Sequence, residues 1–127
     1  MGLRSLVQGK QAERLAARHL RKQGLTLLAV NQRYKCGEID IIAKDVDTHI
    51  FVEVKYRKGK SYGEPAEMVS YEKQIKLAKA AKLWLQDNDP HFDFGCRFDV
   101  IAITTCGKAS SGEDILWLKN AFSPELW

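Results

Sequence analysis

Two carboxylates and an amine, Asp40, Glu53 and Lys55, stand inside strongly apolar segments of the sequence. The segments, residues 38–44 and 49–57, are rich in Ile, Val and Phe, which favour β-strands. Carboxylates that share one site repel each other unless positive charge lies between them. Hard divalent cations such as Mg²⁺ are held by one or two carboxylates together with waters and phosphate oxygens. These residues therefore predict a Mg²⁺ or Mn²⁺ site for phosphodiester hydrolysis, where the lysine orients the attacking water or neutralises charge on the phosphoryl group.

The link between the two segments determines which side chains meet. Residues 45–48 are turn-like, which predicts a hairpin whose turn is centred between positions 46 and 47. That register places Asp40 opposite Glu53, with Cβ atoms about 4.5–5.5 Å apart. It also places Glu38 opposite Lys55, on the face that Glu53 and Lys55 share by strand alternation. The side chains predicted on the other face of the first segment are Ile39, Ile41 and Ala43.

The simplest competing interpretation is a solvated surface. A Glu-x-Lys tripeptide on a strand commonly forms a weak, exposed ion pair. Here Asp40 adds a second acid on the preceding strand, and three charged side chains among apolar residues favour the catalytic interpretation. Other chemistry has less support, because the three histidines are isolated and no Gly-rich phosphate loop of the Walker type is present.

The remaining sequence supplies the elements that would position this site. Two segments with apolar residues every three to four positions predict amphipathic helices, the first ended by Gly24 and the second capped by Ser70. The order α-β-β-β-α-β-β predicts an α/β fold in which a mixed β-sheet is flanked by helices. The expected elements are a helix at 9–23, strands at 25–34, 38–44 and 49–57, a helix at 71–87, and strands at 97–105 and 114–119.

Length and composition restrict the class of protein. The chain has 127 residues, near the commonest size of one domain, so residues 1–127 are expected to form a single domain. Three scattered cysteines without a CxxC pair argue against a disulfide framework or a zinc ribbon and suit a reducing compartment. No apolar run approaches the roughly 20 residues that span a bilayer, and no secretory signal is recognisable. We therefore expect a cytoplasmic protein with no membrane partner.

Basic residues lie on three elements near the predicted acidic site: the first predicted helix, the end of the strand at 49–57 with the run that follows it, and the second predicted helix. The formal net charge is +4. Phosphate backbones bind such surfaces largely through counterion release, whereas a single lysine-rich helix face commonly just solvates. Three basic elements around one acidic centre favour DNA as the partner, with RNA as the second candidate. The residues expected to contact nucleic acid are Arg14, Arg18, Arg57, Lys58, Lys60, Lys73 and Lys76.

The ordered motifs also resemble a known group of enzymes. Gly-Glu-Ile-Asp-Ile-Ile-Ala at 37–43, followed after a turn by Phe-Val-Glu-Val-Lys at 51–55, is similar to the core motif of PD-(D/E)XK nucleases. With Arg-Phe-Asp-Val at 97–100 and Asn-Ala-Phe at 120–122, the chain more closely resembles the YraN family of uncharacterised, endonuclease-like bacterial proteins. This resemblance covers nearly the whole chain. It implies the restriction-endonuclease-like fold, and archaeal Holliday junction resolvases are the similar proteins with known chemistry.

The resemblance implies roles for the residues of the core motif. Asp40 and Glu53 match the metal-binding acids, and the main-chain carbonyl of Val54 would be a further ligand. Lys55 matches the lysine of the motif. Ile39 stands where the motif has a proline, a position at which many members of the superfamily vary.

Two helical residues match supporting positions of related nucleases. Glu13 is similar to a glutamate that joins the active site from the first helix of the resolvases. From the residues alone, an ion pair at the helix edge is equally expected for Glu13. Gln74 matches a glutamine on the following helix of RecB-like nucleases, although Ala78 stands where that motif has a tyrosine.

Together these features predict a metal-dependent endonuclease that hydrolyses phosphodiester bonds of DNA. Branched or single-stranded intermediates of recombination or repair are the candidate substrates. The alternative is a non-catalytic nucleic-acid-binding or recruitment module that retains the nuclease fold. Resolvase-like enzymes need two active sites for symmetric cuts, so a homodimer is a candidate assembly.

Overall fold

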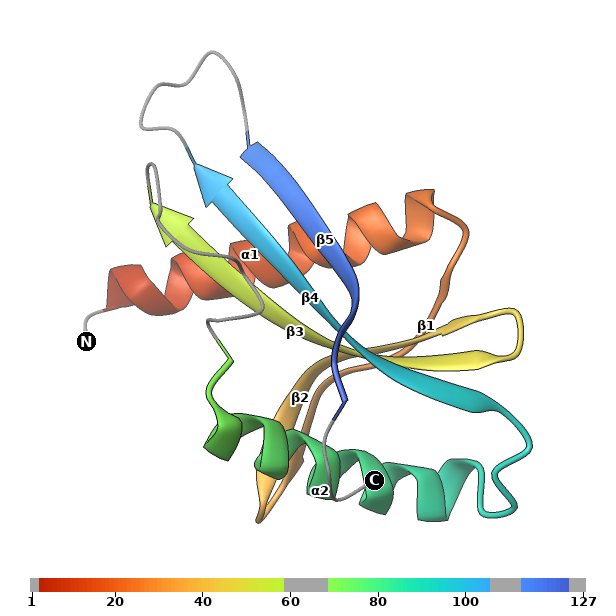
Figure 1. Ribbon diagram of the computed structural model, residues 1–127. Helices are drawn as coiled ribbons and strands as arrows, with labels where there is room; N and C mark the ends of the chain where they lie inside the picture. Colours follow the sequence, from red (N-terminus) through yellow and green to blue (C-terminus); the bar gives the residue numbers. More distant parts are fainter. Residues whose placement is uncertain (1–2, 59–68, 106–112, 124–127) are drawn as a thin grey trace.

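The structure, a computed structural model, describes residues 3–58, 69–105 and 113–123, with side chains at 9–56, 69–104 and 115–123. Helices and strands follow one another in the predicted order, and the predicted α/β class is confirmed (Figure 1). The elements are α1 (Leu3–Lys22), β1 (Thr26–Tyr34), β2 (Gly37–Asp45), β3 (Thr48–Lys58), α2 (Tyr71–Asn88), β4 (Gly95–Thr105) and β5 (Glu113–Phe122).

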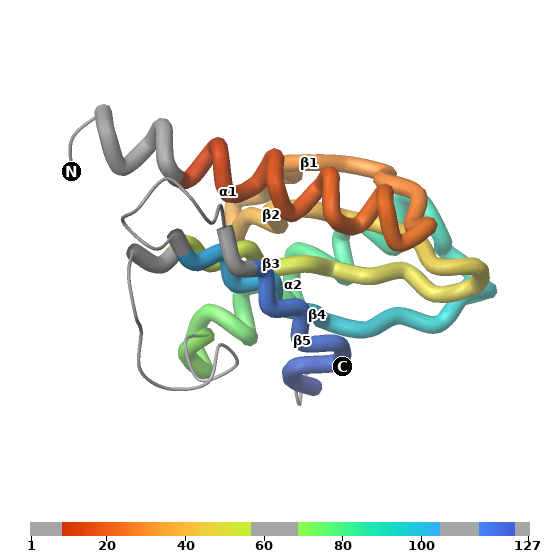
Figure 2. Tube along the Cα trace, turned by 90° about the horizontal axis from the view of Figure 1, so that it is seen from above, coloured from red at the N-terminus to blue at the C-terminus, as the bar shows by residue number. Residues whose placement is uncertain are grey.

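The strands of the described chain form one five-stranded sheet in the order β1-β2-β3-β4-β5. Neighbouring strands are antiparallel except β3 and β4, which are parallel because α2 connects them. α1 covers one face of this mixed sheet and α2 covers the other, as Figures 1 and 2 show. Each helix therefore buries its own apolar cluster, one containing Phe51 and Trp84 beneath α2 and the other containing Leu20 and Val52 beneath α1.

The first helix ends where predicted but begins earlier. Beyond Gly24, whose φ is 92°, the N–H of Leu25 donates to the carbonyl of Leu20 at 3.1 Å and closes the helix. The predicted start at Gly9 is wrong, because α1 begins at Leu3. Residues 3–8 contain no helix breaker, and a glycine inside a helix costs only about 1 kcal/mol relative to alanine.

The second helix begins as predicted after Ser70, whose hydroxyl accepts the N–H of Lys73 at 3.1 Å. This cap fixes the first turn of α2 beside the sheet. The buried side chains of the helix include the predicted apolar stripe of Leu77, Ala81, Trp84 and Leu85.

Two further predictions concern membrane-spanning segments and disulfides. In the described parts of the chain, no helix is both long and apolar enough to cross a bilayer. Among the described residues, Cys36 and Cys96 are not joined in a disulfide, and Cys106 lies outside the described residues.

The β2–β3 hairpin has the predicted register, but β2 is irregular at Asp40. Pairing runs from the turn to Ile41, which lies opposite Val52. On the other side of β2, Asn31 lies opposite Asp40 with a φ of 49° and makes no ladder pair, although the residues on either side of it do. Ile39 then packs in the cluster beneath α2, whereas Ile41 packs beneath α1. The prediction that these two isoleucines share a face is wrong, because the strand changes its course at the acid between them.

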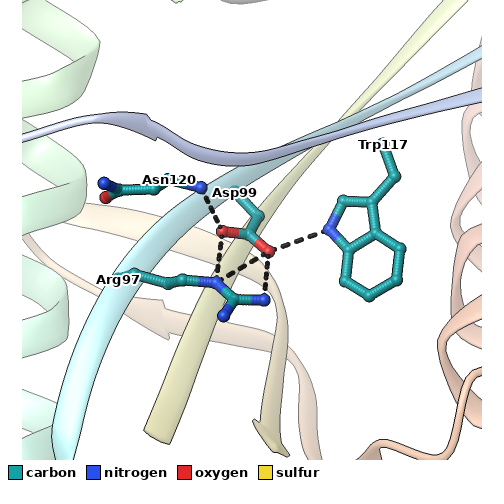
Figure 3. A network of polar contacts seen from close by, with 4 residues as sticks. All are labelled: Arg97, Asp99, Trp117 and Asn120. Carbon is teal, nitrogen blue, oxygen red and sulfur yellow. Dashed lines mark hydrogen bonds and ion pairs between the residues drawn. The ribbon is translucent and has the colours of Figure 1, made fainter.

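A buried carboxylate joins the last two strands (Figure 3). Asp99 of β4 is 0% exposed and accepts the indole N–H of Trp117 and the backbone N–H of Asn120, both at 2.8 Å. Arg97 forms an ion pair with it, with Nε 3.0 Å from Oδ1. Asn120 has a φ of 53° and lies where the β4–β5 register shifts. Asp99 therefore satisfies a backbone group that the irregular pairing leaves without a strand partner.

Replacing Asp99 with asparagine is expected to lower the free energy of unfolding by about 1–3 kcal/mol, because a charged acceptor of several hydrogen bonds is lost. Urea titration measures the change. Asp47→Asn, which alters an exposed turn residue, is the control and should change stability little. Equal stability of both variants would show that the network contributes nothing measurable.

Candidate active site

The two predicted acids lie together at the irregular point of β2. Asp40 Oδ2 accepts the backbone N–H of Val54 at 2.9 Å, which turns its carboxylate toward β3. Glu53 on β3 is 3% exposed. Burial, followed by the charge of Glu53, raises the pKa of Asp40 from 3.8 to about 8, although the Val54 N–H acts in the opposite direction. The protein therefore holds a carboxyl pair that is difficult to ionise fully without an added cation.

Two lysines face the buried acid. Lys55 Nζ lies 3.4 Å from Oε2 of Glu53, which also interacts with Asp40, so the structure brings these three predicted site residues together. Glu38 does not lie against Lys55 as predicted, because ladder pairing between β2 and β3 stops at Ile41 and Glu38 instead pairs with Arg33 at 3.6 Å.

The second amine is Lys73 of α2, which forms an ion pair with the same Oε2 of Glu53. Burial alone would lower the pKa of Lys73, but the hydrogen bond to Glu53 and the charges of Glu53 and Asp40 raise it overall. Lys73 was predicted to contact nucleic acid, and its ion pair with Glu53 was not predicted. The predicted order of elements contained a signal for this contact. A helix that connects the parallel strands β3 and β4 begins near the C-terminal end of β3, and Lys73 lies in the first turn of that helix.

A groove of about 420 Å³ opens beside these groups, between the sheet and α2. Gly37 brings the β1–β2 turn close to α2, since a Cβ atom at this position would lie 3.2 Å from the Lys76 carbonyl oxygen. The acids are thus at the wall of a solvent-open groove and not inside the apolar core. The described residues that line the groove are Gly37, Glu38, Asp40, Glu53, Ser70, Glu72, Lys73, Lys76 and Leu77.

The other buried acids of the described chain have structural partners. Asp89 accepts the backbone N–H groups of Asp93 and Phe94 at 2.9 and 3.1 Å, which closes the turn after α2. Asp99 likewise accepts a backbone N–H. Glu53, by contrast, is paired with two flexible amines beside a groove. Its environment suits a replaceable cation better than a permanent structural contact.

The donor set fits a hard divalent cation. No three His, Cys, Asp or Glu side chains converge in a cluster that could hold a metal, among the side chains whose positions are described. Asp40 and Glu53 supply two carboxylates, and Mg²⁺ typically uses one or two with waters and substrate phosphates. Burial, followed by the charge of Glu53, raises the pKa of Asp40, and a cation shared by the two carboxylates would offset both effects. A zinc-type site with three or four protein ligands is a poorer fit.

The two predicted supporting residues differ in position. Glu13 of α1 is half-buried, and its charge contributes to the raised pKa of Asp40, so it lies near the acids. Gln74 points elsewhere, because its Nε2 donates to the carbonyl of Val69 at 3.0 Å and supports the start of α2. The structure therefore brings Glu13 toward the site and leaves Gln74 outside the described lining of the groove.

The predicted nucleic-acid contacts are only partly described. Arg14 and Arg18 are exposed on α1, and Lys76 is exposed on α2 at the groove. The backbone of Arg57 and Lys58 belongs to β3, but their side chains lie outside the described residues. Lys60 lies wholly outside them.

Similarity to known proteins extends across most of the sequence. A model of the family described as "Uncharacterised protein family UPF0102" matches residues 12–103. A UPF0102 protein of Vibrio campbellii is 47% identical over 125 residues, covering 97% of this chain and 98% of the relative. A UPF0102 protein of Stutzerimonas stutzeri is 46% identical over 114 residues, covering 90% and 92%.

Proposed function

The chain belongs to the uncharacterised protein family UPF0102, and from its site we propose that it is a metal-dependent endonuclease that hydrolyses phosphodiester bonds of DNA. One observation carries this proposal: Asp40 and the 3% exposed Glu53 form a carboxylate pair, with Lys55 beside them, at the wall of an open groove. The resemblance to PD-(D/E)XK nucleases supports the same conclusion. Branched or single-stranded DNA intermediates are the proposed substrates.

Each residue of the site has a distinct part in the proposed reaction. Asp40 and Glu53, with the main-chain carbonyl of Val54, would hold Mg²⁺ or Mn²⁺. When bound, the ion would lower the pKa of the attacking water and polarise a phosphate oxygen. Lys55 extends from the same strand as Glu53, so its ammonium is positioned to donate to a phosphate oxygen or to orient the water. Glu13, whose charge already acts on Asp40, adds negative potential that favours a cation.

A cleavage panel tests the proposal. Linear duplex, single-stranded, flapped and four-way DNA are incubated with Mg²⁺, Mn²⁺ or EDTA. We expect metal-dependent cleavage of at least one branched or single-stranded substrate and none in EDTA. Binding without cleavage of any substrate would instead favour the alternative, a non-catalytic nucleic-acid-binding module, which the exposed basic side chains of both helices support.

DNA binding is expected to weaken steeply as salt concentration rises, because lysine contacts release counterions from the phosphate backbone. The double variant Lys76→Gln, Lys79→Gln removes two exposed charges from α2. It should reduce the slope of log affinity against log salt by about 1.4–1.8, from 0.7–0.9 per phosphate contact. Fluorescence anisotropy in EDTA measures the slope. An affinity that salt does not change would exclude the basic surface as the docking site.

A further inference from the structure

Lys73 approaches the acidic pair from a different direction from Lys55. Lys55 belongs to the same strand as Glu53, whereas Lys73 reaches across the groove from α2 to the sheet. Its backbone is fixed, since its own N–H is held by the Ser70 cap at 3.1 Å. The side chain of Lys73 is 43% exposed, and its ammonium forms an ion pair with the carboxylate of Glu53, which is 3% exposed. Of the two lysines that contact Glu53, Lys73 is therefore the more exposed, because the side chain of Lys55 is only 22% exposed.

The position of this ammonium conflicts with that of a bridging cation. A divalent ion shared by Asp40 and Glu53 needs lone pairs of the Glu53 carboxylate, and Oε2 already contacts both Lys73 and Lys55. An ion with two positive charges also repels an ammonium at the same carboxylate. Lys73 is the group better able to leave, because its side chain can swing into the open groove while its backbone stays capped.

We propose that Lys73 is a built-in counter-ion of the acidic pair, which neutralises Glu53 in the metal-free protein and which a divalent cation must displace. The inference rests on the proposed function in one respect, the cation site formed by Asp40 and Glu53. In this role Lys73 controls access of the cation to Glu53, which differs from a surface contact with DNA. This role also explains how a chain can fold with the half-buried Asp40 beside the buried Glu53 before any metal arrives.

Competition of this kind lowers the apparent affinity for the cation. If the ammonium occupies Glu53 in about nine molecules of ten, only the remaining tenth is competent to bind, and removing the ammonium tightens binding about tenfold. The same removal leaves a buried acid with one partner fewer, which lowers the stability of the metal-free protein. Tighter cation binding together with a less stable metal-free state is the signature of a displaceable counter-ion.

The test compares Lys73→Gln with Lys76→Gln. Both variants remove one charge from the same groove, but the described contacts of Lys76 include no ion pair with Glu53. Isothermal titration with Mn²⁺ and thermal unfolding in EDTA are measured on each full-length protein. We expect Lys73→Gln to bind Mn²⁺ about tenfold more tightly and to melt at a lower temperature without metal. Lys76→Gln should change Mn²⁺ affinity less than about twofold and leave the melting temperature near that of the wild type.

A Glu53→Gln background separates this inference from the proposed function. There, Lys73→Gln should no longer lower the metal-free melting temperature, since the acid that it neutralises is gone. Mn²⁺ binding that requires Glu53 but is not tightened by Lys73→Gln overturns the counter-ion role alone. Equally tighter Mn²⁺ binding by Lys73→Gln and Lys76→Gln also overturns it, because the loss of any positive charge from the groove would then explain the change in affinity. No Mn²⁺ binding by any of the proteins overturns the displacement and the proposed function together.

Discussion

Replacing Glu53 with glutamine is expected to abolish binding of Mg²⁺ or Mn²⁺ and to lower the rate of DNA cleavage by at least about 10²–10³-fold, with the fold unchanged. The size follows from the loss of a single electrostatic contact in an active site. Glutamine keeps the volume of the side chain and can still accept a hydrogen bond from Lys55 or Lys73, but it supplies no charge to a cation. Glu53→Ala should give the same loss of cleavage, with an added cavity at a position that is 3% exposed.

The measurement is the initial cleavage rate on the best substrate of the panel, accompanied by Mn²⁺ titration and circular dichroism. Asp47→Asn is the matched control, because it removes one negative charge from an exposed turn at the far end of the β2–β3 hairpin. Its cleavage rate should stay within about twofold of the wild-type rate. Unchanged cleavage by Glu53→Gln would reject the catalytic assignment of the acid pair.

The core of this site could be predicted because it depends on local rules. The turn between β2 and β3 determined the register, and the observed pairing of Ile41 with Val52 is the pairing that a turn centred at 46–47 implies. Strand alternation then predicted that Glu53 and Lys55 share a face. In the structure, Nζ of Lys55 lies 3.4 Å from Oε2 of Glu53. The helix faces followed from periodicity in the same way, and the predicted stripe of α2 is buried.

The contacts that escaped prediction depend on how distant segments dock. Lysines recur at every third position of α2, and Lys73 and Lys76 were both predicted to contact nucleic acid, so nothing within the helix singles out Lys73. Only the placement of its first turn beside the sheet gives that lysine an acid to contact. The contact of Gln74 depends on the start of α2 in the same way, because its Nε2 donates to the carbonyl of Val69, the residue before the cap. The irregularity of β2 at Asp40 likewise lies opposite Asn31 of the neighbouring strand, which has a positive φ that the sequence of β2 does not reveal.

Replacing Asp40 with asparagine is expected to stabilise the metal-free protein at pH 8 by on the order of 2–4 kcal/mol. The folded-state pKa of Asp40 is raised from 3.8 to about 8, so between these values the folded chain holds a proton that the unfolded chain has lost. Wild-type stability therefore falls as pH rises through this range, by up to about 1.4 kcal/mol per pH unit. Asparagine does not titrate and still offers an oxygen to the Val54 N–H, so the variant loses this dependence.

Urea unfolding in EDTA at pH 5, 6.5 and 8 measures how the free energy of unfolding of the wild type and of Asp40→Asn changes with pH. The control Asp47→Asn is expected to show the same pH dependence as the wild type. Adding Mg²⁺ at pH 8 should reverse the order, because a ligand that binds only the folded wild-type site stabilises it while the variant gains little. A carboxyl that weakens the empty protein and strengthens the loaded one is a binding group and not a structural one. If Asp40→Asn instead destabilised the metal-free protein at pH 8, Asp40 would resemble Asp99, whose carboxylate serves the fold through the N–H of Asn120.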